Sequence, residues 1–371
     1  MYKGTGISKD QLSDDGEPCI LYGELYTKYK SETIREVISK TNIDNTKLVR
    51  SKANDVIIPC SGETAEDIAT ARCVLNGNIL LGGDLNIIRL HGYDGAFMSY
   101  QLNGRRKYDI AKVAQGVSVV HLYGEHLKGV KTINPCLKEQ KKIASLLALL
   151  DERISTQNKI IEDLKKLKSA IIENVFDDKH SERLQLDNVG SYIRGLTYSS
   201  NDVVEHGGTL VMRSNNIVNG SLLDYNNNVV FVNKQMSAEQ QLQNGDVVIC
   251  MANGSSSLVG KSSFYDGSCH SPITVGAFCG IYRSKEPIVK WLFQTNKYRR
   301  YIWNSLQGGN GAIANLNGED ILNMSFSIPN ATIKDTCVKM LTSVDSALEN
   351  NMSLCALYTL QKQHLLRLMF I

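Results

Sequence analysis

The chain has 371 residues, which is too long for one compact domain and fits two or three domains of roughly 100–200 residues each. Its hydrophobic fraction of 42% supports a sizeable core and excludes a wholly disordered chain. The 41 Lys and Arg residues against 38 Asp and Glu leave a net charge of +3, which excludes a histone-like polycation. Any contact with nucleic acid must therefore come from local basic clusters.

The cysteines and the apolar runs narrow the class of protein further. Nine cysteines are scattered singly, without a CxxC pair or a metal-ligand spacing. This pattern indicates reduced thiols, so we expect neither a zinc site nor a disulfide framework. No apolar run approaches the ~18 residues of a membrane span, and the N-terminus carries no apolar signal-peptide stretch. We therefore expect a cytoplasmic protein.

The first part of the chain, residues 1–135, alternates short β-branched runs with turns rich in Gly, Asn, Asp and Ser. The runs at 56–59 and 86–88 predict strands. The segments 64–73 and 105–114 predict helices among them. This mixture predicts an α+β domain.

Residues 136–178 predict a first long helix. Apolar residues recur between 143 and 175 at alternating steps of four and three residues, which is the coiled-coil signature. No Gly or Pro interrupts 137–176, so this segment can form one helix of about 40 residues, ~60 Å long at ~1.5 Å per residue. The expected packing positions are Ile143, Leu147, Leu150, Ile154, Ile161, Leu164 and Ile171.

The same pattern returns 194 residues later and predicts a second long helix at 330–371. Even the polar interruptions coincide, because Gln157 falls on Asn351 and Lys168 falls on Lys362. The expected packing positions of this helix are Leu341, Val344, Leu348, Tyr358 and Leu365.

Two such helices, with a large domain between them, most simply pair antiparallel, with their polar positions fixing the register. The alternative is that each helix is amphipathic and packs only on its own domain.

The globular parts upstream of the two helices match as well, with small gaps. Residues 19–25 match 210–216, and 54–62 match 245–254. The basic segment 105–116 matches 297–308, and each of the two predicts a basic helix that ends at Gln-Gly. The predicted plan is a globular domain, a long helix, a second globular domain and a second long helix, at 1–135, 136–178, 184–329 and 330–371.

Motifs for catalysis are missing. The run 253–263 follows a predicted strand as a phosphate-binding loop does, but five residues instead of four separate Gly254 from Gly260, and turn residues follow where a helix is needed. The chain has no GxSxG elbow, GxGxxG loop or HExxH helix, and no Asn/Asp-Pro-Pro-aromatic loop to hold a flipped base. We therefore predict no catalytic residue, and no cofactor or metal site in this chain.

Basic segments and polar loops that occur in both copies suit nucleic acid instead. Arginine can hold phosphates or read guanine edges, and loop amides and hydroxyls can bond to base edges. The alternatives are a solvated basic helix face and ordinary turns. The candidate DNA-binding residues are Tyr22, Ser61, Glu63, Thr64, Arg105, Arg106 and Lys107 in the first copy, and Arg213, Asn215, Asn253, Ser255, Lys297, Arg299 and Arg300 in the second.

Several of these segments together resemble the specificity subunit of type I restriction–modification systems. The similarity covers nearly the whole chain, and its most specific part is a Pro-x-x-x-Glu-Gln run that leads into a long helix containing Leu-Asp-x-x-Ile. The segments that carry the resemblance are 6–29, 54–69, 80–88, 114–122 and 135–154.

The resemblance implies a non-catalytic subunit that recognises double-stranded DNA. Each globular domain would be a target-recognition domain that reads one half of a bipartite sequence. The two helices would pack as an antiparallel spacer and dock two methyltransferase subunits, which bind S-adenosylmethionine and methylate adenine. Restriction subunits would add ATP- and Mg-dependent translocation and cleavage. This chain itself would hold no cofactor.

Two departures from the family pattern stand out. The second copy keeps Pro329 but has Ile333-Lys334 where the first has Glu139-Gln140, so docking at that end is expected to differ in detail. The second domain opens with the segment 184–195, whereas the first begins almost at its matching glycine, Gly4. An opening strand of about ten residues is thus expected to be missing from the first domain, either because the gene start is placed late or because that strand is borrowed from elsewhere.

A different class of protein stays open as the alternative. A coiled-coil scaffold whose globular ends bind proteins would also have this plan, and the near-neutral charge favours it because many DNA-binding proteins are basic.

Overall fold

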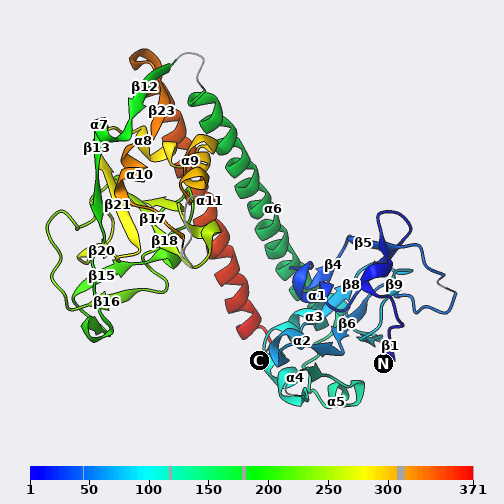
Figure 1. The fold of residues 1–371 in the computed structure, drawn as a ribbon. Helices are drawn as coiled ribbons and strands as arrows, with labels where there is room; N and C mark the ends of the chain where they lie inside the picture. The colour runs from blue at the N-terminus through cyan, green and yellow to red at the C-terminus, as the bar shows by residue number, and fades with distance from the viewer. Residues whose placement is uncertain (45, 117–118, 178–180, 307–313, 371) are drawn as a thin grey trace. The chain divides into compact units, whose positions relative to one another are not determined.

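The computed structural model describes residues 1–44, 46–116, 119–177, 181–306 and 314–370. The chain forms two compact units, which are unit 1 (Met1–Lys159 with Met352–Ile371) and unit 2 (Ile160–Asn351). The two long helices, α6 (Leu137–Val175) and α11 (Ala331–Leu368), each contribute a segment to both units (Figure 1).

Unit 1 contains two mixed sheets and a short two-stranded ladder. The first sheet has the order β1-β10-β6-β8-β4, and the second has the order β2-β5-β3-β9. All neighbours are antiparallel except β4 with β8 and β3 with β9. The ladder joins β7 to β11. The strands are β1 (Tyr2–Lys3), β2 (Leu12–Ser13), β3 (Glu17–Ile20), β4 (Thr33–Ile34), β5 (Ser39–Thr41), β6 (Asp55–Pro59), β7 (Ser61–Gly62), β8 (Arg72–Val74), β9 (Leu80–Leu81), β10 (Leu85–Ile88) and β11 (Val120–His121).

Strand β6 separates the two cores of this unit. Its side chains alternate, so Val56 and Ile58 pack among the helices while Ile57 faces the core shared with the second sheet. The helix α3 starts at Asp94, whose carboxylate accepts a hydrogen bond from the backbone N–H of Phe97 at 2.8 Å. The helices of unit 1 besides the long ones are α1 (Glu24–Thr27), α2 (Ala65–Ile68), α3 (Gly95–Asn103), α4 (Lys107–Val113) and α5 (Gly124–Lys128).

Unit 2 repeats this architecture. Its sheets have the orders β13-β21-β17-β19 and β14-β16-β15-β20, and β18 pairs with β22. The strands are β13 (Gly190–Arg194), β14 (Val203–Val204), β15 (Thr209–Met212), β16 (Val230–Val232), β17 (Val247–Cys250), β18 (Ala252–Asn253), β19 (Ser262–Phe264), β20 (Ile273–Val275), β21 (Cys279–Ser284) and β22 (Ala314–Asn315). The shorter helices are α7 (Leu186–Val189), α8 (Val289–Leu292), α9 (Asn296–Leu306) and α10 (Gly318–Leu322).

A repeated ion pair shows how closely the two units correspond. In unit 1, Arg89 donates two hydrogen bonds to Asp55, at 3.0 and 2.8 Å. In unit 2, Arg283 donates the same pair of bonds to Asp246, at 2.8 and 2.6 Å. In unit 1 the pair joins Arg89, which directly follows β10, to Asp55 of β6, and in unit 2 it joins Arg283 of β21 to Asp246, which directly precedes β17. The expected α+β fold class, with long helices and an internal repeat, is confirmed by this structure.

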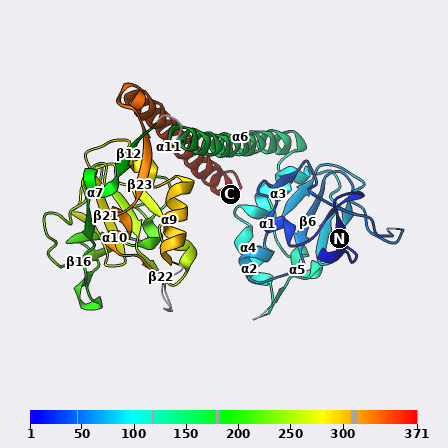
Figure 2. The ribbon, with the colours of Figure 1, turned by 45° about the horizontal axis from the view of Figure 1, so that its top comes forward.

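Unit 2 has one two-stranded ladder without a counterpart among the described strands of unit 1. The strands β12 (Ser181–Gln185) and β23 (Ser325–Pro329) pair antiparallel over five residues and lie side by side in Figure 2. By the 194-residue shift, β23 corresponds to residues 131–135 of unit 1, which form no strand. Among the residues that the structure describes, unit 1 has no ladder corresponding to β12–β23.

Two local expectations were wrong. Only α2 is helical within the segment 64–73, because Arg72–Val74 is the strand β8, paired with β6 and β4. The basic segment at 105–114 is helical only from Lys107, and Arg105 lies in the turn before it.

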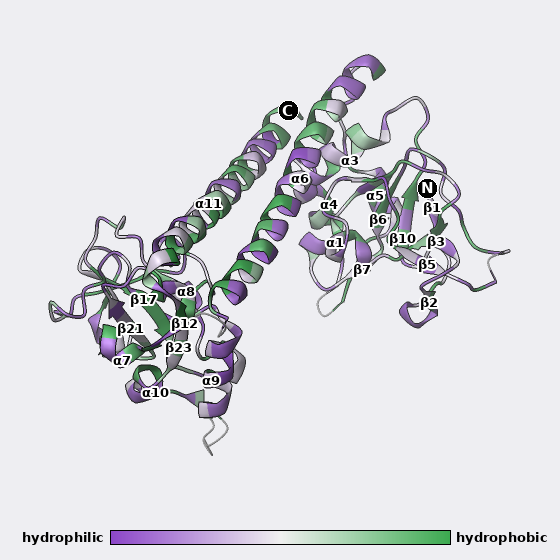
Figure 3. Ribbon diagram, turned by 90° about the horizontal axis from the view of Figure 1, so that it is seen from above, coloured by the Kyte–Doolittle hydropathy of each residue, from purple (hydrophilic) through white to green (hydrophobic). Residues whose placement is uncertain are grey.

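The two long helices carry the packing that their sequence spacing indicates. All twelve expected packing positions are buried or half-buried, and in Figure 3 hydrophobic residues recur along both helices with hydrophilic ones between them. In unit 1, Asp151 pairs with Lys362 and Asn158 contacts Cys355, so the two segments run antiparallel. Among the described residues, no helix is both long and apolar enough to cross a membrane.

Candidate nucleic-acid interface

Helix α9 (Asn296–Leu306) presents a basic face in unit 2 because its two tyrosines, Tyr298 and Tyr301, turn inward. Tyr298 is buried and its hydroxyl donates to the carbonyl of Gly260 at 2.8 Å. The hydroxyl of Tyr301 donates to the carbonyl of Ser325 at 3.0 Å. Arg299 and Arg300 are exposed, as expected for residues on the opposite side of an anchored amphipathic helix. This face can contact phosphates.

Two further residues of α9, Lys297 and Trp303, lie near Arg299 and Arg300 in the sequence. Lys297 is half-buried in the first turn of α9, and Trp303 is 66% exposed one turn further on. Trp303 and Arg299 line a groove of about 610 Å³ together with Lys261.

The basic residues of unit 1 do not share one helix face. Arg105 is exposed in the turn after α3, and Arg106 is the residue before α4, where its guanidinium lies 3.4 Å from Asp109. Lys107 is half-buried at the start of α4. The expectation of two equivalent basic helices is therefore wrong for the first copy, whose basic residues lie around a turn.

Two loops of unit 2 meet where their strands end: residues 213–216 follow β15, and residues 253–255 lie after β17. Arg213 follows β15, and its backbone N–H donates to the side chain of the buried Asn216 at 2.9 Å. The Asn216 amide in turn donates to the carbonyls of Asp224 and Asn227, at 3.0 and 2.7 Å. Asn216 thus holds the loop internally, while Arg213 and Asn215 stay exposed.

The second of these loops is joined to the first by a hydrogen bond. The Asn253 amide donates to the Ser214 hydroxyl at 3.3 Å. The Asn253 carbonyl oxygen accepts from the backbone N–H of Ser255 at 3.0 Å, which shapes the following turn. The structure thus brings together Arg213, Asn215, Asn253 and Ser255, the four loop candidates of the second copy.

A pocket of about 480 Å³ lies beside these loops. Its lining includes Tyr198 and Phe278, neither of which was among the sequence candidates. Both come from turns of other strands, which no local pattern connects with the loop Arg213–Asn216. The 194-residue shift was the one available signal, since it places Phe278 on Asp84 within an otherwise matched segment.

The loop candidates of unit 1 divide into structural and exposed residues. The Thr64 hydroxyl accepts from the backbone N–H of Asp67 at 3.1 Å and caps α2. Ser61 is buried, and its hydroxyl donates to the Asp84 carboxylate at 3.0 Å. Glu63 is exposed, and Tyr22 is half-buried against the core.

The hydrogen bonds also correct the alignment of the two copies at one place. The N–H of Gly82 donates to the carbonyl of Ile20 at 2.9 Å, and the N–H of Gly276 donates to that of Met212 at 2.8 Å. Ile20 therefore corresponds to Met212, and the match of 19–25 with 210–216 moves by one residue. As a result, Tyr22 corresponds to Ser214 rather than to Arg213.

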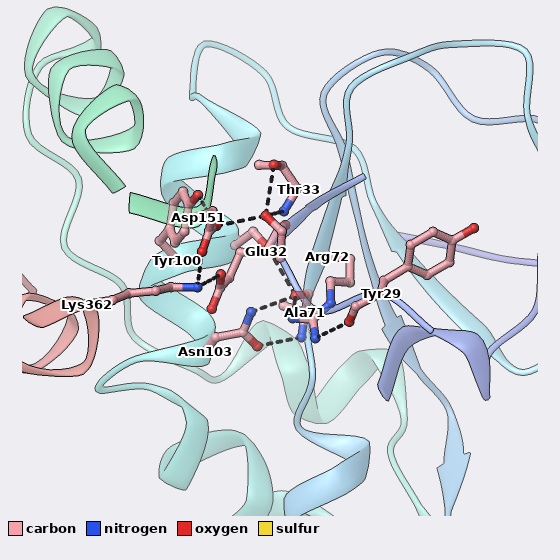
Figure 4. A network of polar contacts seen from close by, with 11 residues as sticks. Tyr29, Glu32, Thr33, Ala71, Arg72, Tyr100, Asn103, Asp151 and Lys362 are labelled. Atoms are coloured by element: carbon pink, nitrogen blue, oxygen red, sulfur yellow. Dashed lines mark hydrogen bonds and ion pairs between the residues drawn. The ribbon is translucent and has the colours of Figure 1, made fainter. Parts of the chain in front are cut away.

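A buried ion-pair cluster ties the long helices to the globular part of unit 1 (Figure 4). Lys362 of α11 pairs with both Asp151 of α6 and Glu32. The Asp151 carboxylate also accepts hydrogen bonds from the Tyr100 hydroxyl at 2.7 Å and from the Ser31 hydroxyl at 2.8 Å. Burial raises the pKa of Glu32, and the Lys362 ammonium opposes that shift.

The corresponding cluster of unit 2 has the same lysine–aspartate pair between the long helices, with the two helices exchanged. Lys168 of α6 pairs with Asp345 of α11 at 2.7 Å, and Trp291 Nε1 donates to Asp345 at 2.9 Å. Burial lowers the pKa of Lys290, whose ammonium lies 3.6 Å from the same carboxylate. In each unit an aspartate thus links the helix pair to the adjoining domain.

Catalytic chemistry finds little support at these surfaces. Among the described residues, no three His, Cys, Asp or Glu side chains gather as a metal site would require. Burial raises the pKa of the Cys73 and Cys279 thiols to about 12, so neither is a ready nucleophile. The exposed candidate residues of the two units carry guanidinium, amide, hydroxyl and carboxylate groups.

The comparisons with known proteins agree on one family of relatives, although no family model matches the chain. Over 155 residues (39% of this chain, 31% of the relative), the chain is 34% identical to the type I restriction enzyme EcoKI specificity subunit of Escherichia coli. Over 153 residues (39% and 31%), it is 33% identical to the StySPI specificity subunit of Salmonella potsdam. Each match thus spans about a third of the relative's length.

The fold is similar to that of a solved structure over its whole length. The S subunit of a type I restriction–modification system from M. genitalium matches with a TM-score of 0.63, covering 100% of this chain and 93% of that chain at 16% identity. The resemblance to type I specificity subunits, recognised from the sequence, is confirmed by the curated relatives, and the solved structure confirms the fold.

Proposed function

We propose that the chain is the DNA-recognition subunit of a type I restriction–modification complex and that each globular domain reads one half of a bipartite target. The observation that carries the proposal is the duplication. Each unit has two sheets with corresponding strand orders, to which unit 1 adds β4, and polar loops beside the ends of their central strands. A protein with two separate copies of one reading surface suits a target with two separate halves.

In this proposal one group of residues contacts the phosphates and another group reads the bases. Arg299 and Arg300 on α9, with Arg105 in unit 1, hold phosphates, because adjacent exposed arginines splay apart and cannot all reach one base pair. Arg213 and Asn253 lie on the joined loops of unit 2 and read base edges.

The long helices act as a spacer and a docking surface. Each helix of nearly 40 residues spans ~60 Å, which is commensurate with half-sites one to two DNA turns apart at ~34 Å per turn. Apolar side chains on the helix segments of unit 1 remain exposed, with Leu149 at 58%, Leu357 at 61% and Leu360 at 60%. Exposed apolar residues of this size favour docking of protein partners, here two methyltransferase subunits.

Catalysis belongs to the partner subunits. The methyltransferase subunits would supply S-adenosylmethionine and adenine methylation, and restriction subunits would supply ATP- and Mg-dependent translocation and cleavage. Assembly and action take place in the cytoplasm, where the DNA target is accessible. The near-neutral net charge of +3 fits a subunit that contributes contacts through local clusters.

A mobility-shift titration on duplex DNA tests this function against that of a protein-binding scaffold. The chain assembled with methyltransferase subunits is expected to bind DNA with an affinity that falls steeply between two salt concentrations, because phosphate contacts release counterions. Methyltransferase subunits alone serve as the control. A complex that forms but shifts no DNA at low salt favours the scaffold.

A further inference from the structure

Both units present a side chain at a corresponding turn, which lies directly before β10 in unit 1 and directly before β21 in unit 2. In unit 1 the backbone N–H of Cys60 donates to the carbonyl of Asp84 at 2.6 Å, and in unit 2 the N–H of Met251 donates to the carbonyl of Phe278 at 2.9 Å. Asp84 precedes β10, and Phe278 precedes β21. The backbone position is thus repeated while the side chain differs.

Phe278 lies between the two candidate reading loops of unit 2. Its carbonyl also accepts from the N–H of Ala252, at 3.1 Å, which fixes it to the loop that carries Asn253. On its other side it lines the 480 Å³ pocket with Arg213 and Asn215. The side chain is nevertheless 65% exposed, so it contributes little to the core. An exposed aromatic residue among convergent polar groups is typical of a contact surface.

Asp84 occupies the corresponding place beside a candidate loop of unit 1. Its backbone has a φ of 57°, a left-handed conformation that Asp tolerates better than most residues. The side chain is exposed, and the Ser61 hydroxyl donates to one of its carboxylate oxygens at 3.0 Å. A carboxylate has several acceptor positions, so Asp84 can accept further hydrogen bonds from a ligand.

We propose, on the premise of the function above, that Phe278 and Asp84 are specificity-determining residues that contact base edges at equivalent places in the two half-sites. Phe278 makes an apolar contact, for which the methyl group of thymine is the matching feature of the major groove. Asp84 accepts a hydrogen bond, for which the exocyclic amino group of cytosine is the matching donor. Turns that share one backbone hydrogen bond would thus read two different bases.

The test uses the chain assembled with methyltransferase subunits and a set of duplexes in which each position of the target is substituted in turn. Phe278→Ala is expected to lose roughly fivefold or more of the discrimination at one position of one half-site. Phe278→Leu, which stays apolar, is expected to retain part of it. Val203→Ala, at another exposed apolar residue of unit 2, is the matched control and is expected to change no position.

Asp84→Asn addresses the other half-site and keeps the turn. Asn tolerates the left-handed conformation as Asp does, so the fold is retained while one acceptor becomes a donor. Discrimination is expected to change at one position of the other half-site. Asp14→Asn, at an exposed aspartate of unit 1, is its control. Thermal unfolding of each variant checks that the fold is intact.

The outcomes separate this inference from the function on which it rests. If the wild-type complex binds all duplexes alike, the proposed function fails, and the inference fails with it. If the wild type discriminates and Phe278→Ala and Asp84→Asn discriminate equally well at every position, only the inference is overturned. A variant that changes both half-sites also contradicts it.

Discussion

Lys362 is the cation that faces two buried carboxylates in unit 1. Its side chain is 12% exposed, and those of Glu32 and Asp151 are 9% and 10% exposed. Lys362→Met removes the ammonium and leaves two carboxylates in a poorly hydrated place, so we expect a loss of about 3–5 kcal/mol in the free energy of unfolding. Urea denaturation measures it.

The control for this substitution is Lys166→Met. Lys166 pairs with Glu162 on the exposed side of α6, where both side chains are more than 65% exposed (68% and 67%). Exposed pairs are screened by water and contribute little, so the expected loss is much smaller than for Lys362→Met. Equal losses for the two variants would contradict the role given to the buried cluster.

Glu32 makes the stability of this cluster depend on pH. Burial raises its pKa above the ordinary 4.5, so the folded protein prefers the neutral carboxyl. Its contribution is most favourable below pH 4.5 and is lost as the pH rises through the raised pKa. Glu32→Gln stays neutral throughout, so its melting temperature relative to the wild type should rise between pH 4.5 and pH 8. Glu36→Gln, at an exposed glutamate, should show no such trend, and a constant or falling difference for Glu32→Gln would refute the argument.

The salt dependence of DNA binding distinguishes residues of unit 2 that hold phosphates from residues that read bases. Replacing Arg299 and Arg300 by Ala should weaken binding to all sequences alike and reduce the salt slope by about one unit per lost contact. Arg213→Ala or Asn253→Ala should instead relax one position of a half-site by ~1–3 kcal/mol. Salt titrations on cognate and single-substituted duplexes measure both. An Arg299/Arg300 variant that keeps its salt slope and loses discrimination would reverse the two assignments.

Sequence patterns identified residue types at the interface better than residue roles. The exposed Arg213 and the half-buried Asn253 could be predicted, because polar residues that follow a buried strand lie near its end. The capping role of Thr64 and the hydrogen bond from Ser61 to Asp84 could not, since the partners are fixed by backbone geometry or by another strand. Phe278 was missed for the same reason.

The long helices were the most predictable elements. Their 4-3 spacing is a local property, and the positions it selects are buried or half-buried in the structure. The segment 64–73 was harder, because Arg72–Val74 becomes a strand only through pairing with β6 and β4. Strand formation depends on such distant partners more than helix formation does.

The spacer role of the helices can be tested by shortening them together. Deleting seven residues, one heptad, from both α6 and α11 keeps their packing positions in phase. The unspecified spacer of the methylation target should become shorter while both half-sites stay unchanged. The assay is methylation mapping of DNA exposed to the assembled complex. An altered half-site with an unaltered spacer would contradict the spacer role.

At the scale of the whole molecule, the two units share most of their structural features because the chain contains an internal repeat. Both units share strand orders, the bidentate arginine–aspartate pair and the aspartate that links the helices to the domain. Such shared structural residues leave the loops free to differ, as Asp84 and Phe278 do. The repeat was visible in the sequence because the long helices recur at a spacing of 194 residues and the globular parts match with small gaps.

The central claim is that each domain reads its own half of a bipartite DNA target. Replacing 186–315 with the corresponding domain of a relative, followed by methylation mapping by single-molecule sequencing, tests it most directly. The account predicts that one half-site changes to that of the donor while the other half-site stays the same. A target in which both half-sites change, or methylation that does not depend on the exchanged domain, would contradict it.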